Sequence, residues 1–232
     1  MIIEISGIDG SGKSTQIAML ARLAQEAGVP CYERPIRSTC RRVVSGIAAQ
    51  LGLASWRTVF DRSAVELATA LEAHQMVYST ILSINFPGQL IVTDTYVRNL
   101  LAVAIAEGGA AIDQLVAIYA TFPRPDVSVH LDVPIDEAYA RIEARPKGDH
   151  LLRTGGQARL QRLADAYDGA LNEWIPYPCA RVSSEIGLGD TFDAIVKCVI
   201  SAASQHDEPL AERLQDATRA RIRELEADGS DD

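Results

Sequence analysis

The hydrophobic positions of this chain alternate between short apolar runs and longer stretches with helical spacing. The apolar runs at residues 1–5, 29–32, 89–94, 126–132 and 180–182 have the length of buried strands. In the segments between them, apolar residues recur every three or four positions, which is the spacing of one helix face. Strands that alternate with helices indicate a parallel sheet covered on both faces. We therefore expect an α/β fold with five parallel strands.

The helical segments differ in length and in the chemistry of their polar faces. Helices are predicted over residues 14–26, 40–51, 58–84, 96–107, 110–121, 157–172 and 191–204, and Pro134 is placed to begin another. The longest, 58–84, carries a polar stripe that contains Glu66, Glu72 and Gln75. This stripe is expected to face away from the core.

The chain divides into one domain and a charged C-terminal segment. Residues 1–205 contain the whole strand and helix alternation, and no internal repeat is present. Within this domain, residues 145–156 combine proline, glycine and basic side chains without apolar periodicity, which predicts a mobile lid loop. After the domain, residues 206–232 are strongly charged. We expect an amphipathic helix over 210–225 and a disordered acidic end over 227–232.

Composition excludes several classes of function. The net charge of −9 argues against a nucleic-acid polymer as partner, while a local basic cluster remains compatible with a small phosphorylated ligand. The four cysteines are far apart and form no CxxC pair, so neither a zinc site nor a disulfide framework is indicated. No apolar run is long enough to span a membrane, and the N-terminus begins with a strand pattern. We expect a reduced, cytoplasmic protein.

The turn after the first strand carries the strongest chemical signal. Its sequence fits the pattern G-x-x-x-x-G-K-[ST], in which glycines let backbone N–H groups approach phosphate oxygens. Lys13 is expected to reach the β- and γ-phosphates of ATP, and Ser14 to ligate Mg²⁺. The helix that begins there adds its positive end to the same site. The expected ATP-binding residues are Gly7, Asp9, Gly10, Ser11, Gly12, Lys13, Ser14 and Thr15.

These residues, with four further places, resemble the thymidylate kinase family of P-loop kinases. The phosphate loop of that family is similar to residues 5–16 here, including its acidic residue. Residues 35–39 resemble the family's loop after the second strand, and residues 94–96 lie where the family has Asp-Arg-Tyr or Asp-Arg-His. Pro125 with residues 131–134 is also typical. Arg141, Arg145 and Arg153 fall in the region of the family's lid.

The resemblance implies catalytic roles for several side chains. The lid arginines Arg145 and Arg153 would follow the transferred phosphate into the transition state. Asp94 is expected to hold the metal, directly or through water, although it could instead cap the following helix. Asp9 would face the acceptor sugar or the reacting oxygen. Glu33 ends the second strand, where related deoxynucleoside kinases keep a carboxylate base, so it becomes a candidate base if the acceptor is a hydroxyl.

The acceptor site departs from the family pattern. Ala68 and Glu72 stand where the family has an aromatic that stacks on thymine and an arginine that recognises it, and Thr95 replaces the arginine that contacts the acceptor phosphate. Two positive charges are therefore missing, which predicts weak binding of thymidine monophosphate. Arg37 or Arg98 could compensate in part. The expected acceptor-binding residues are Arg37, Glu72, Thr95, Tyr96 and Arg98.

The leading hypothesis is an ATP- and Mg²⁺-dependent phosphotransferase acting on a nucleotide, nucleoside or related small molecule other than thymidine monophosphate. Two alternatives stay open: a nucleotide-binding protein with reduced catalysis, and a kinase of a specialised non-nucleotide metabolite. The resemblance also implies a homodimer packed through the long helices. Leu67, Leu71, Val77 and Ile81 could supply that face or serve an ordinary core.

Overall fold

The centre of the fold is a parallel sheet that places β1 between two neighbours. The computed structural model describes every residue except 110, 145–155, 170–173, 176 and 229–232. In the described chain, β1 (Ile2–Ser6) lies between β3 (Leu90–Thr93) and β4 (Val127–Asp132), with β2 (Cys31–Glu33) and β5 (Ala180–Ser183) at the edges. All four strand pairings are parallel. The predicted α/β fold with five parallel strands is confirmed.

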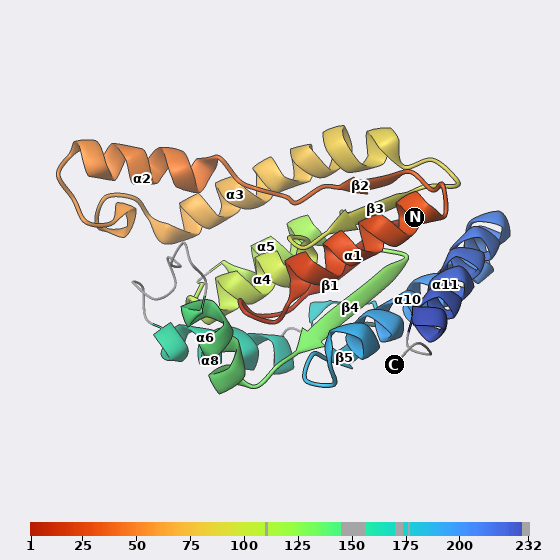
Figure 1. Ribbon diagram of the computed structural model, residues 1–232. Helices are drawn as coiled ribbons and strands as arrows, with labels where there is room; N and C mark the ends of the chain where they lie inside the picture. The colour runs from red at the N-terminus through yellow and green to blue at the C-terminus, as the bar shows by residue number, and fades with distance from the viewer. Residues whose placement is uncertain (110, 145–155, 170–173, 176, 229–232) are drawn as a thin grey trace.

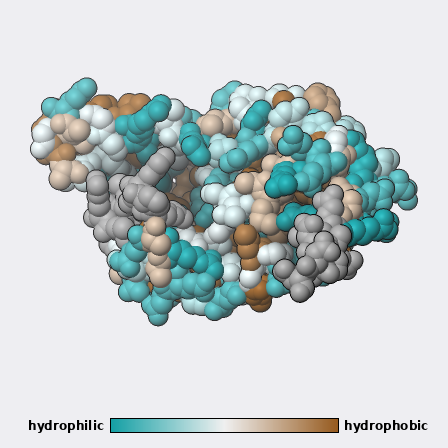
Figure 2. Space-filling model, viewed as in Figure 1, coloured by the Kyte–Doolittle hydropathy of each residue, from teal (hydrophilic) through white to brown (hydrophobic). Residues whose placement is uncertain are grey.

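Helices cover both faces of this sheet (Figure 1). Three helices contribute to the apolar cluster on one face: α1 (Lys13–Glu26), α10 (Leu188–His206) and α11 (Glu208–Asp228). Five contribute to the cluster on the other: α3 (Arg62–Met76), α4 (Val97–Ala106), α5 (Ile112–Tyr119), α6 (Ile135–Glu143) and α8 (Gly156–Asp168). The remaining labelled helix, α2 (Cys40–Gln50), packs against α3 and projects with it beyond the sheet. Figure 2 shows apolar side chains at the surface of this projecting lobe.

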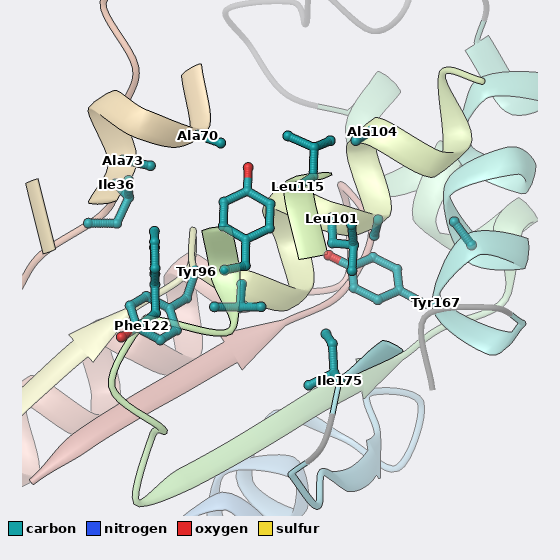
Figure 3. Packing of buried hydrophobic residues seen from close by; sticks show 14 of the residues in the cluster. Ile36, Ala70, Ala73, Tyr96, Leu101, Ala104, Leu115, Phe122, Tyr167 and Ile175 are labelled. Carbon is teal, nitrogen blue, oxygen red and sulfur yellow. The ribbon is translucent and has the colours of Figure 1, made fainter. Parts of the chain in front are cut away.

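The side chains of β1 alternate between the two cores, as a strand buried on both faces requires. Ile2 belongs to the cluster with α3, α4 and α5, while Ile3 and Ile5 belong to the cluster with α1 and α10. Tyr96 and Phe122 pack edge to face in the first cluster, with ring centroids 5.8 Å apart (Figure 3). Each face of the sheet therefore has its own continuous core.

The predicted helix 58–84 is divided into several kinds of helical turn. A turn of 3-10 helix covers Trp56–Thr58, and Asp61 then caps α3 by accepting a hydrogen bond from the Ala64 N–H at 2.8 Å. After α3 the chain continues as a π-helical turn (Val77–Ile81) and a 3-10 turn (Leu82–Ile84). Hydroxyls in this stretch donate to carbonyls one turn earlier, as Thr80 does to Met76 at 2.7 Å. Such bonds compete with the regular helical ladder.

Parallel strands bring two chemically important turns to the same edge of the sheet. Glu4 of β1 is in register with Thr93 of β3. The carboxyl ends of both strands therefore meet, with Gly7 following one and Asp94 following the other. In open α/β sheets, ligands bind at the carboxyl ends of the strands, at the point where the strand order reverses. Here that point is β1, which lies between β3 and β4. A ligand site is therefore expected at this edge.

The C-terminal helix α11 is tied to the domain by apolar and polar contacts. Its Leu210 and Leu214 are buried in the same cluster as α1 and α10. Arg213 donates to the carbonyls of Ala27 and Gly28 at the end of α1. An arginine at the carbonyl end of a helix also opposes the negative end of the helix dipole. The helix extends to Asp228, beyond the predicted 210–225, and residues 229–232 lie outside the described chain.

Burial of Leu214 predicts that α11 contributes to the stability of the whole domain. Leu214→Ala removes a side chain that is 0% exposed, so the free energy of unfolding should fall by about 2–4 kcal/mol. Arg219→Ala, on the exposed face of the same helix, should change it by less than about 0.5 kcal/mol. Urea denaturation followed by circular dichroism measures both. Equal, small effects of the two changes would mean that α11 does not stabilise the domain.

Candidate active site

The turn after β1 is held tightly against neighbouring backbone. Gly10 has φ 86°, and a Cβ there would lie 2.4 Å from the carbonyl oxygen of Ala138 on α6. Gly7 has φ 145°, and its Cβ would lie 2.9 Å from the carbonyl oxygen of Leu131 at the end of β4. Both positions therefore require glycine for backbone angle and for space. The turn is fixed in position relative to β4 and α6.

Lys13 and the first turn of α1 face the space above this loop. The Lys13 ammonium donates to the carbonyls of Gly7 and Ile8, each at 2.9 Å. Gly12 caps α1, and in the described chain no side chain caps this end and no acidic residue lies in the first turn. The amides at this end and the positive end of the helix dipole are thus directed at one region. That arrangement suits a phosphate group.

Arg141 fixes the loop from behind. Its guanidinium donates to the Gly10 carbonyl at 3.3 Å and to the Ser184 carbonyl at 3.0 Å, and it pairs with Glu137 one turn earlier on α6. The resemblance had placed Arg141 among the lid arginines. In the structure it joins the phosphate loop to the segment after β5, so its contacts are those of a residue that positions the loop.

A cleft with a volume of about 980 Å³ opens in front of the loop. Its floor contains Gly7, Asp9 and Lys13, and Asp94 and Thr95 follow β3 along one side. Basic side chains contributed by the lobe of α2 and by α8 also line it: Arg41, Arg57, Arg159 and Arg162. Arg57 and Arg159 both pair with Glu107. Positive charge around a cleft concentrates anionic ligands.

Three oxygen-bearing side chains near the phosphate loop are candidates to hold a magnesium ion. Asp94 and Asp9 line the cleft, and Ser14 is exposed in the first turn of α1. Mg²⁺ prefers hard oxygen ligands and is usually held by one or two protein groups together with phosphates and waters. Asp94 accepts a hydrogen bond from the Thr95 hydroxyl at 3.0 Å. It does not cap α4, because Tyr96 is the N-cap residue and no side chain of the described chain caps that end.

A second, inner cavity of about 220 Å³ adjoins the cleft between α3, α4 and α5. Arg41, Thr95, Asn99 and Val103 line both spaces. Arg37 lines only the inner cavity. Of the predicted acceptor-binding residues, Arg37 and Thr95 are therefore brought together.

Arg41 is a basic residue that sequence reasoning missed. It is half-buried in the first turn of α2 and forms no hydrogen bond or ion pair with the described chain. A guanidinium held at the junction of two cavities without an acidic partner is suited to an anionic ligand. The available signal was its place four residues after Arg37, in the first turn of the predicted helix 40–51.

Tyr96 and Arg98 lie outside both cavities. Tyr96 is 0% exposed, and its hydroxyl donates to the Pro123 carbonyl at 2.9 Å. Arg98 is 5% exposed and donates to the Tyr177 carbonyl at 2.8 Å, while its backbone N–H donates to Glu4. The face of α4 that carries Arg98 packs on the sheet, so these side chains are used in the core. The expectation that they contact the acceptor does not match their positions.

Glu72 serves a different purpose from the one expected. Its carboxylate accepts hydrogen bonds from the Ser38 hydroxyl at 2.6 Å and from the backbone N–H groups of Thr39 at 2.9 Å and Cys40 at 3.0 Å. It therefore caps α2 from α3 and lines neither cavity. Burial alone would raise the pKa of Glu72, but these hydrogen bonds outweigh it and lower the pKa to about 2.

Other predicted residues fall outside the two cavities or outside the described chain. Glu33 is exposed at the end of β2 and lines neither cavity. Ala68 is exposed. Arg145 and Arg153, with residues 145–155 of the predicted lid, lie outside the described residues, while Gly156 begins α8. Val77 and Ile81 are 0% exposed and serve the core, whereas Leu71 is 60% exposed.

Three comparisons place the chain among known proteins. The family model described as thymidylate kinase matches residues 5–172. A probable thymidylate kinase from Pyrococcus abyssi is 28% identical over 166 residues, which cover 69% of this chain and 80% of that relative. A thymidylate kinase from Xanthomonas euvesicatoria pv. vesicatoria is 31% identical over 171 residues, which cover 70% of this chain and 68% of that relative.

A solved structure shares the fold. The deoxyadenosine kinase from M. mycoides, with bound dATP, has a TM-score of 0.58 and 15% sequence identity, and the match covers 85% of this chain and 97% of that one. In addition, the described helices include none with the length and apolar character needed to cross a membrane.

The cap formed by Glu72 predicts a pH-dependent loss of stability. Because the folded-state pKa is about 2 and the ordinary value is 4.5, the contribution is complete above pH 4.5 and is lost as the pH falls towards 2. At pH 7, Glu72→Gln should lower the free energy of unfolding by about 1 kcal/mol, since solvent screens this partly exposed group. The exposed control Glu212→Gln should have little effect. Denaturant titrations at several pH values test this, and a wild-type advantage that persists unchanged to pH 2.5 would contradict it.

Proposed function

The chain belongs to the thymidylate kinase family, and from this premise we propose that it transfers the γ-phosphoryl group of ATP to a nucleoside monophosphate other than thymidine monophosphate. The observation that carries the proposal is that the cleft and the inner cavity adjoin each other. The cleft above the phosphate loop and the inner cavity share four lining residues, so a donor and an acceptor can meet between them.

The donor half of the proposal assigns ATP to the phosphate loop. Lys13, the loop amides and the end of α1 would hold the β- and γ-phosphates. Ser14 and Asp94 would hold Mg²⁺, which would neutralise charge on the phosphates. The exposed position of Ser14 and the place of Asp94 in the cleft support this assignment. Asp9 lines the same cleft, where it would face the acceptor.

In this mechanism the protein positions the two substrates and stabilises charge, and it forms no covalent bond with them. Phosphoryl transfer needs the attacking oxygen, the transferred group and the leaving oxygen in line, with the developing charge stabilised. An acceptor phosphate is already nucleophilic, so it requires no base. Glu33, the candidate base for a hydroxyl acceptor, lines neither cavity. This favours a phosphorylated acceptor over a nucleoside. The lid arginines Arg145 and Arg153 remain proposed sources of charge for the transition state.

Arg41 supports a phosphorylated acceptor more directly. Thr95 occupies the position where the family resemblance expects an arginine, and Arg41 lines the same two spaces as Thr95. We propose that Arg41, with Arg37 at the rim of the inner cavity, binds the acceptor phosphate in its place. The cation would then come from α2 instead of from the turn after β3.

The exclusion of thymidine monophosphate rests on position 72. The family resemblance expects a thymine-recognising arginine there, whereas the Glu72 carboxylate is engaged at the start of α2.

We extend the proposal to a cytoplasmic homodimer. Its support is that all four cysteines are free and that Leu71 and Tyr78 are exposed along the α3 segment.

An assay with a panel of acceptors tests the function. Purified protein with ATP and Mg²⁺ is expected to phosphorylate at least one nucleoside monophosphate more efficiently than it does thymidine monophosphate or any free nucleoside. Lys13→Ala should lower kcat/KM by about 100-fold or more, because it removes the cation on the transferred phosphate. Preference for thymidine monophosphate would overturn the acceptor assignment. Slow ATP hydrolysis without stimulation by any acceptor would overturn transfer itself.

The role of Arg41 has a separate test. Arg41→Gln should raise the KM for the phosphorylated acceptor by about 10- to 100-fold and leave the KM for ATP unchanged, since a charge-assisted hydrogen bond to the acceptor is lost. Arg42→Gln, an exposed neighbour that lines neither cavity, is the matched control and should behave like the wild type. Unchanged acceptor KM in Arg41→Gln would remove Arg41 from the acceptor site.

A further inference from the structure

Glu66 places a buried carboxylate on the wall of the inner cavity. The residue is 3% exposed and lines that cavity. Its Oε1 accepts a hydrogen bond from the Arg62 Nε at 2.7 Å. Its Oε2 has no hydrogen-bond partner in the described chain and lies beside Gly109, where a Cβ would be 2.9 Å away from it. A buried acceptor without a donor is costly, so such an atom calls for an explanation. The sequence pattern had placed Glu66 on an outward polar stripe, which is wrong.

The polar side chains around Glu66 also have hydrogen-bond acceptor atoms available to a ligand. The Thr69 hydroxyl donates to the Val65 carbonyl at 2.8 Å, so only its lone pairs remain. The Asn99 Nδ2 donates to the Tyr167 hydroxyl at 3.2 Å, which leaves the amide oxygen and one N–H. Both residues line the inner cavity. The cavity therefore offers hydrogen-bond acceptors to a ligand that brings N–H donors.

Tyr119 and Arg41 complete the polar side of the cavity. Burial raises the pKa of Tyr119, while the charge of Arg41 lowers it and that of Glu66 raises it, so both charges act on the hydroxyl. Tyr119 lines the cavity and can donate or accept. Arg41 lies where the inner cavity joins the cleft, which is the end nearer the phosphate loop. A ligand would thus have its anionic end near Arg41 and its polar ring edge near Glu66.

Apolar side chains form the remaining walls: Ile36, Leu100, Val103, Ala104 and Leu115. Figure 3 shows Ala104 of α4 and Leu115 of α5 close together beside α3. A volume of 220 Å³ corresponds to about seven waters at ~30 Å³ each, which is enough for a small flat ring. Apolar walls with a few convergent polar groups are typical of a ligand site.

We propose that Glu66 determines the specificity of the acceptor by accepting a hydrogen bond from an amino group on its ring. The substrate class is then a nucleoside monophosphate with an amino-bearing base, and this rests on the proposed function. A ring with an oxo group in that place would bring its oxygen against the carboxylate, and two acceptors repel each other. Sites built to bond a donor reject analogues that lack it.

The proposal is tested with pairs of nucleotides in which an oxo group, with an N–H on the neighbouring ring nitrogen, replaces the amino group. Binding of CMP and UMP, and of AMP and IMP, is measured calorimetrically with wild-type protein, and kcat/KM is measured for the same pairs with ATP and Mg²⁺. The amino member of at least one pair should bind about 10- to 100-fold more tightly than its oxo partner. Equal binding within both pairs, or preference for the oxo members, would overturn the proposal.

Two variants separate Glu66 from a general effect on the helix. Glu66→Gln keeps the shape and the contact with Arg62 but offers an N–H₂ group, so the amino-to-oxo ratio should fall by about 10-fold or more. Gln75→Glu makes the reverse change on the exposed side of α3 and should leave the ratio as in the wild type. An unchanged ratio in folded Glu66→Gln would assign the preference to another residue. The wild-type comparison is decisive on its own should that variant fail to fold.

The outcomes also distinguish this inference from the proposed function. Discrimination in binding without phosphoryl transfer would leave Glu66 as a ring-selecting residue and overturn the kinase assignment. Transfer to amino and oxo members with equal efficiency would keep the kinase and overturn the role of Glu66.

Discussion

The close approach of the phosphate loop to the backbone of α6 and β4 is the constraint on which the site depends. With Gly10 against the Ala138 carbonyl and Gly7 against that of Leu131, the loop has little freedom to move as a unit. Arg141 adds polar contacts on the same side. The amides that would receive a phosphate are therefore arranged before any ligand binds, which is how electrostatic stabilisation is obtained without reorganisation.

The proposed acceptor site takes its positive charge from a different element than the family resemblance implies, and the fold allows this. The turn after β3 and the first turn of α2 face each other across the same junction, so a cation on either can serve a ligand between them. Thr95 leaves the turn after β3 without a charge, and Arg41 supplies a cation from α2. Glu66 adds a carboxylate, paired with Arg62, to the otherwise largely apolar wall of the inner cavity. The family fold is thus compatible with more than one acceptor chemistry.

The sequence predicted the parts of the molecule that depend on local pattern. Apolar runs marked all five strands, and the glycine and lysine spacing marked the loop after β1. Side-chain direction on helices was harder, because it depends on which elements pack against each face. Glu66 looked solvent-facing until α4 and α5 were seen to cover it, and Glu72 looked like a ligand contact until the start of α2 was seen beside it. Arg98 was misplaced for the same reason, since only the sheet determines which face of α4 is buried.

The capping role of Glu72 also affects how this pocket could change over time. Arginine at that position would put a cation against the backbone N–H groups of Thr39 and Cys40, and α2 would lose its anchor together with Arg41. One replacement at position 72 would thus also disturb the element that carries Arg41. A change of side chain at position 72 therefore needs a second change that gives α2 a new attachment, so the two changes are coupled.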